Sequence, residues 1–187
     1  MWTKGLWHWY RGEAFMGLER FEEALVDLRQ ACNLDYCAPP YQEAARAFLK
    51  LGRAREAQAA AVRAVMIEPE NAFSCSLVGA AAFEAGDYGL SVSWSTEALK
   101  LASGEPYLKL AARLNLAVAL LASGDSNATM THLQEALNTD HLTVAPDESA
   151  GLFAEARADI KKLLKARPDL KETAQGVLVL LTGSADK

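Results

Sequence analysis

The stretch that decides the fold spans residues 38–71 and reads APPYQEAARAFLKLGRAREAQAAAVRAVMIEPEN. Within it, the aromatic Tyr41 is followed by the small pair Ala44 and Ala45 and then by Phe48. Four later positions complete the pattern: Ala57, Ala61, Ala64 and Pro69. Small residues at helical spacing let two antiparallel helices approach closely, and neither helix can bury its apolar stripe alone. The stretch therefore predicts a helix pair that needs neighbours of its own kind.

The pattern recurs on both sides of this stretch. Upstream, Gly12 and Phe15 take the places of a small residue and the aromatic, one residue short of a full period of about 34 residues. Downstream, Gly79 and Ala117 take the place of the small residue. Four copies in register predict repeats at about 4–37, 38–71, 72–105 and 107–140. Four glycines are expected to end the first helices by adopting positive φ: Gly17, Gly52, Gly86 and Gly124.

Both ends of the chain depart from the regular pattern. Beyond residue 140 it weakens, and we expect one long helix at about 147–167, a closing helix at about 169–182 and a disordered tail at 183–187. Residues 1–182 are expected to form a single domain. At the other end, aromatic residues crowd the first helix: Trp2, Trp7, Trp9 and Tyr10. This cluster is interpreted either as a cap of the stack or as the junction with a longer chain, and we prefer the second interpretation.

The spacing of large, small and aromatic residues resembles that of tetratricopeptide-repeat (TPR) proteins. The resemblance implies an all-α fold, in which about four repeats and the C-terminal helices form a right-handed superhelical stack of antiparallel helix pairs. The first and fourth copies are most similar to chaperone-linked, immunophilin-type TPR domains. Those domains hold a C-terminal carboxylate with a clamp of Lys, Asn and Arg. Here the equivalent places hold Tyr10, Glu43 and Leu77, and only Asn115 is suitable, so the clamp is incomplete.

In the family, first helices line a concave groove that binds a partner peptide or helix. Carried over by register, the partner-binding positions are mostly apolar with a few polar groups: Trp9, Glu13, Met16, Gln42, Arg46, Leu49, Phe73, Ser76, Ala80, Phe83, Asn115 and Val118. A continuous apolar groove is typical of an interaction site. The alternative is that a helix of the same chain, or a missing part of a longer one, fills it.

Composition and motifs exclude several other classes of function. The net charge is −5 and the pI is about 5.3, which disfavours a nucleic-acid partner. Neither the three cysteines nor His8, His132 and His141 have the spacing of a disulfide framework, a metal site or a catalytic site, so we expect no cofactor, no metal and no enzyme activity. No stretch is long and apolar enough to cross a membrane, and no signal peptide is recognised, which favours a cytoplasmic protein.

Three functions fit these observations. The first is an interaction scaffold or adaptor that binds a peptide or an amphipathic helix of another protein. The second is a regulatory or co-chaperone-type TPR module of a longer, immunophilin-like protein. The third is a structural module that associates with itself as a homodimer.

Overall fold

The computed structural model describes residues 4–34, 37–138 and 143–183, and within these ranges the chain is helical and contains no strand. The chain divides into two compact units, Met1–Asp87 and Tyr88–Lys187, which we call unit 1 and unit 2. Each is described by itself.

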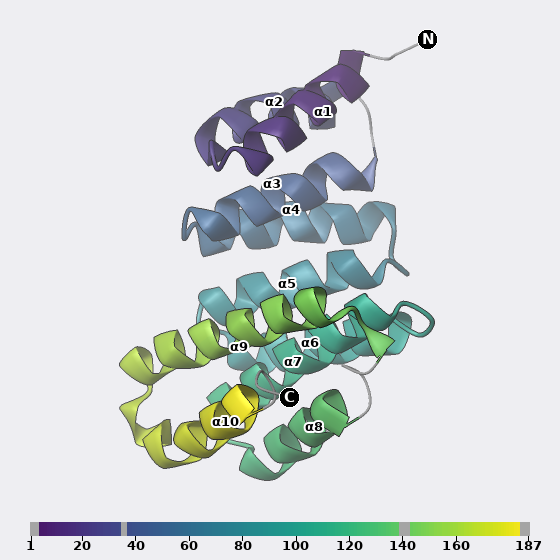
Figure 1. The fold of residues 1–187 in the computed structure, drawn as a ribbon. Coiled ribbons are helices and arrows are strands. Elements are labelled where there is room, and N and C mark those ends of the chain that lie inside the picture. The colour runs from purple at the N-terminus through teal and green to yellow at the C-terminus, as the bar shows by residue number, and fades with distance from the viewer. Residues whose placement is uncertain (1–3, 35–36, 139–142, 184–187) are drawn as a thin grey trace. The chain divides into compact units, whose positions relative to one another are not determined.

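Unit 1 consists of two antiparallel helix pairs and a fifth helix (Figure 1). Its helices are α1 (Lys4–Gly17), α2 (Phe21–Leu34), α3 (Ala38–Lys50), α4 (Ala54–Ile67) and α5 (Ala72–Glu84). Each helix packs against the next one along the chain, and in addition α3 contacts both α1 and α5. The first helices of the repeats, α1, α3 and α5, therefore lie beside one another.

Small residues allow the helices of a pair to approach closely. A Cβ atom added to Gly12 of α1 would lie 2.9 Å from Cγ of Leu28 on α2. Leu28 is fully buried, and so are Ala24 on α2 and Ala57 on α4. Ala and Gly at these places remove the side-chain bulk that would otherwise hold the helices apart, and large residues fill the remaining space at close-packed density.

The turns inside the first two repeats have the same backbone structure. Gly52 has φ of 70°, and the next amide, that of Arg53, donates to the carbonyl of Phe48 at 2.8 Å. In the first repeat the residue with positive φ is Glu19, at 57°, and not Gly17 as expected. Gly17 is instead the last residue of α1. The residue with positive φ comes after the end of the helix, and this residue is Gly52 in the second repeat and Glu19 in the first. The expectation of positive φ is confirmed for Gly52, Gly86 and Gly124.

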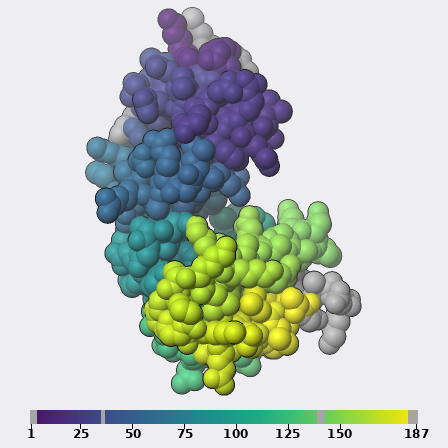
Figure 2. Space-filling model, turned by 90° about the vertical axis from the view of Figure 1, so that its left-hand side faces the viewer, coloured from purple at the N-terminus to yellow at the C-terminus, as the bar shows by residue number. Residues whose placement is uncertain are grey.

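Unit 2 contains the remaining helices, of which α7 is the central one. Its elements are α6 (Tyr88–Leu101), α7 (Pro106–Ser123), α8 (Ser126–Asn138), α9 (Pro146–Ala166), the 3₁₀ helix η2 (Pro168–Leu170) and α10 (Lys171–Gly183). Helix α7 contacts α6, α8 and α9, and α9 packs on α10, beside which it lies in Figure 2. Arg157 of α9 donates to the carbonyl of Leu181 at 2.9 Å, and Arg167 donates to that of Ala122 at 2.9 Å. These bonds tie the C-terminal helices to each other and to α7.

The predicted fold class, an all-α stack of antiparallel helix pairs, is confirmed. The superhelical sense and the single domain over 1–182 stay predictions, and residues 184–187 of the expected tail lie outside the described residues. None of the described helices is both long and apolar enough to span a membrane.

Candidate binding face on the first helices

The predicted partner-binding residues of unit 1 form rows across α1, α3 and α5. By repeat register, Met16, Leu49 and Phe83 are equivalent and make one apolar row at the C-terminal ends of these helices. Ten residues earlier, about 15 Å along each helix, the predicted Phe73 is equivalent to Leu6 and Pro39, which were not among the predicted residues, and the three make a second apolar row. All six residues are half-buried. Since α3 contacts both α1 and α5, the residues of each row lie on neighbouring helices.

Between the apolar rows lies a row of mixed chemistry. Glu13 on α1, Arg46 on α3 and Ala80 on α5 are equivalent, and Glu13 and Arg46 are exposed. The Arg46 guanidinium donates to both carboxylate oxygens of Glu43, at 2.9 and 3.0 Å. This face, which we call the first-helix face, therefore presents both signs of charge between two apolar rows.

Trp9 and Met16 also belong to the interior of unit 1. Both pack against the buried cluster of α2 and α3 that contains Leu28 and Ala47. The Trp9 ring stacks on Tyr10, with centroids 5.1 Å apart, and its buried indole nitrogen has no hydrogen-bond partner among the described residues. Truncating Trp9 would disturb the packing of α1, so this residue is a poor probe of binding alone.

Gln42 is buried in the structure. Its side-chain amide donates to the hydroxyl of Ser74 at 2.9 Å, which joins α3 to α5. Ser74 is itself held at the start of α5, where its backbone amide donates to the Asn71 side chain at 2.9 Å. The Gln42 amide is therefore occupied by a contact inside unit 1. Its register equivalent on α5, Ser76, is half-buried.

The two predicted residues in unit 2, Asn115 and Val118, lie on α7. Val118 is buried, with 6% of its surface exposed, and so are its face neighbours Leu114 and Leu121. Asn115 is half-buried. Helix α9 of the same unit lies against α7. Val118 is thus buried in this structure, and its role in binding a partner stays a prediction.

The incomplete carboxylate clamp stays a prediction, and the structure shows the surroundings of the three residues named for it in unit 1. Glu43 forms its ion pair with Arg46, Leu77 is buried, and Tyr10 is exposed.

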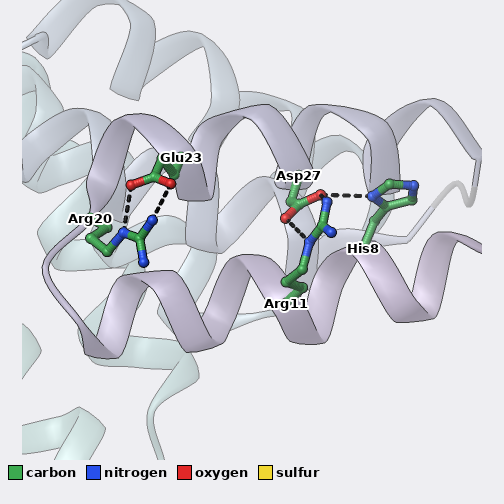
Figure 3. A network of polar contacts seen from close by, with 5 residues as sticks. All are labelled: His8, Arg11, Arg20, Glu23 and Asp27. Atoms are coloured by element: carbon green, nitrogen blue, oxygen red, sulfur yellow. Dashed lines mark hydrogen bonds and ion pairs between the residues drawn. The ribbon is translucent and has the colours of Figure 1, made fainter.

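A polar network between α1 and α2 did not follow from the sequence (Figure 3). The Asp27 carboxylate is 2% exposed and accepts two bonds from Arg11, at 2.5 and 2.6 Å, while Nδ1 of His8 lies 2.8 Å from it. The hydrogen bond from Arg11 lowers the pKa of Asp27 most; burial opposes this shift, and the contact with His8 adds to it. The one feature of the sequence that could have predicted this network is the acidic Asp27 beside Leu28, inside the apolar stripe of α2. The network fastens α1 to α2.

Within the described part of the chain, the remaining Cys and His side chains are not gathered into a metal site. Burial raises the pKa of the Cys32 thiol to about 12, so this thiol stays protonated. In unit 2, burial and then the nearby Arg113 lower the pKa of His132, and Arg113 is paired with Glu135. The described residues include no group of three His, Cys, Asp or Glu side chains that could hold a metal ion. His141 lies outside the described residues.

Comparison with solved structures defines the fold as that of TPR proteins. YrrB, a TPR protein with an unusual peptide-binding site, is 16% identical, with a TM-score of 0.62 over 96% of this chain and 86% of that chain. TTC0263, a TPR protein of Thermus thermophilus, is 18% identical, with a TM-score of 0.63 over 94% of this chain and 99% of that one. PilF of Pseudomonas aeruginosa is 18% identical, with a TM-score of 0.66 over 91% of this chain and 86% of its own. No protein-family model and no curated protein sequence matches this chain.

Proposed function

We propose that this chain is a protein-interaction scaffold that receives a segment of another protein on the first-helix face of unit 1. The observation that carries the proposal is the pair of apolar rows with Glu13 and Arg46 between them. Half-buried apolar residues at equivalent positions of neighbouring helices are typical of surfaces that bind peptides, while exposed charges between them select register and orientation. The role involves no catalysis, cofactor or metal.

The spacing of the rows describes the partner segment. Apolar anchors about 15 Å apart correspond to about four or five residues of extended chain. A segment with two apolar side chains at that separation, and charged residues between them, would bury both anchors and place its charges near Glu13 and Arg46. A chaperone tail is a weaker candidate, because the Glu43 carboxylate opposes a second carboxylate. The peptide-binding site in the name of YrrB is consistent with a peptide partner here.

A displayed library of random peptides tests this function. We expect the wild-type chain to select peptides with paired apolar anchors, and a Glu13→Lys/Arg46→Glu variant to lose those peptides. Both residues are exposed and the exchange leaves the net charge unchanged. Because Arg46→Glu also removes the ion pair with Glu43, thermal melts establish that the variant is folded. The matched control is Arg63→Glu/Glu70→Lys, which makes the same exchange at exposed positions away from the face. Equal binding by the wild type and the face variant, or no selection by the wild type, would overturn the proposal.

A further inference from the structure

Helix α4 presents an outer face, which we define by five exposed residues: Arg55, Ala59, Val62, Arg63 and Met66. At 3.6 residues per turn, these residues lie within about 100° of one another around the helix axis. The buried residues of α4, which are Ala57, Ala61 and Ala64, lie on the opposite side. The outer face is therefore one strip on the solvent side of α4, and it extends about 16 Å along the helix.

The centre of the outer face is apolar. Ala59, Val62 and Met66 follow one another at spacings of three and four residues, which is the pattern with which a helix buries a stripe against a partner. Val62 is 37% exposed and Met66 is 61% exposed, so both side chains offer apolar surface to water. Methionine adapts its shape to its neighbours and is common at binding surfaces. The stripe thus has the composition of a packed surface and the exposure of a free one.

The equivalent places on two other second helices are mostly polar. On α6 they hold Gly89, Ser93, Thr96, Glu97 and Lys100. The last two of these residues form an ion pair at 2.9 Å. On α2 the same places hold Glu22, Val26, Arg29, Gln30 and Asn33. The apolar stripe on α4 is therefore not a requirement of the repeat, whose conserved geometry depends on the small residues of the buried side.

The two arginines of the outer face have no acidic partner. Neither Arg55 nor Arg63 forms an ion pair or a side-chain hydrogen bond in the described part of the chain. Four of the other five arginines of unit 1 are paired: Arg11 with Asp27, Arg20 with Glu23, Arg46 with Glu43 and Arg53 with Glu56. The outer face contains no carboxylate of its own, so a surface that complements it carries negative charge beside an apolar stripe.

We propose that the outer face of α4 docks an acidic amphipathic helix of another protein. The apolar stripe of that helix covers Val62 and Met66, and the small Ala59 lets the two backbones approach closely. Carboxylates that flank the stripe pair with Arg55 and Arg63, since guanidinium groups bind carboxylates with two parallel hydrogen bonds. A second copy of this chain is a poorer occupant, because pairing two outer faces would gather four arginines and no carboxylate.

A displayed library of helical peptides with randomised side chains on one face tests the charge of the partner. We expect the wild-type chain to select helices with an apolar stripe flanked by Asp or Glu. Arg55→Glu/Arg63→Glu should raise the dissociation constant of a selected helix by about tenfold or more, and should itself select helices flanked by Lys or Arg. The matched control is Lys161→Glu/Lys165→Glu, which makes the same change of charge at two exposed positions of α9 and should bind like the wild type.

A second pair of variants tests the apolar stripe. Val62→Ser/Met66→Gln should also raise the dissociation constant of a selected acidic helix by about tenfold or more, because it removes the surface that the apolar side of that helix covers. The control is Val179→Ser on α10, where a 69% exposed valine lies outside the outer face, and it should leave binding unchanged. Thermal melts establish that all of these variants are folded.

Three results would overturn the proposal. One is that the wild-type chain selects no helix, or selects helices without flanking carboxylates. Another is that Arg55→Glu/Arg63→Glu binds a selected helix as tightly as the wild type does. The third is that the wild type binds phosphatidylserine vesicles and no helix, which would assign the outer face to an anionic membrane surface. The variant Glu13→Lys/Arg46→Glu should bind selected helices fully, so failure of the proposal for the first-helix face and failure of this one are distinguishable.

Discussion

Adding a single methyl group at Gly12 tests the close approach of α1 and α2. In Gly12→Ala the new Cβ would lie 2.9 Å from Cγ and 3.0 Å from Cδ2 of Leu28, which is fully buried. Overpacking of this kind destabilises by about 1–3 kcal/mol, whereas replacing a helical Gly by Ala stabilises by about 1 kcal/mol. We therefore expect a net loss of about 1 kcal/mol in the free energy of unfolding, measured by urea denaturation.

Two comparisons isolate the contact with Leu28. Gly151→Ala, inside α9, meets no atom within 4 Å and should stabilise by the helix-propensity term alone. Leu28→Ala costs about 2–5 kcal/mol by itself. In that background Gly12→Ala should become stabilising, because the clashing atoms are gone, which gives a coupling energy of about 1–3 kcal/mol in a double-mutant cycle. If Gly12→Ala stabilised the otherwise wild-type chain as much as Gly151→Ala does, the helix contact described here would be wrong.

Three further substitutions test other parts of the structure. Ala57→Leu, at a fully buried position on α4, should lower the melting temperature because it costs about 1–3 kcal/mol of folding free energy. Arg55→Leu, at an exposed position, should change the melting temperature little, and the opposite ranking would refute the repeat register. Glu19→Gly should raise the free energy of unfolding by about 1 kcal/mol, since Glu19 adopts the positive φ that its equivalent Gly52 adopts without strain, and an unchanged or lowered value would contradict that conformation. The hydrogen bond from Arg11 lowers the folded-state pKa of Asp27. The ionised Asp27 carboxylate therefore stabilises the fold fully above the ordinary aspartate pKa of about 3.9. This stabilisation is lost as the pH falls from there through the folded-state pKa. Urea titrations should find Asp27→Asn less stable than the wild type at neutral pH and the two chains converging in acid, while a constant difference would rule out this linkage.

The repeated helix pairs could be predicted from the sequence because the information is local. Close packing of two helices requires small residues at fixed spacing, so the positions of Gly12, Ala24 and Ala57 indicated which residues would meet. The turn at Gly52 followed for the same reason, since positive φ favours glycine. Glu19 broke that rule, because hydrogen bonds that close the first turn impose the conformation on a residue that does not favour it.

Contacts between repeats were decided by the tertiary structure, because residues far apart in sequence determine whether a given side chain meets solvent or protein. The sequence predicted that Gln42 lies in the groove, whereas in the structure its amide donates to Ser74 on the next first helix. Val118 has the register of a binding residue and yet is buried in unit 2, where α9 lies against its helix. The sequence by itself thus determined the helices, their pairing and the rows of side chains across them. Only the tertiary structure decided that Arg11 would be anchored by Asp27 and that Trp7 would stand exposed at the end of unit 1, because burial depends on the presence of a neighbouring helix.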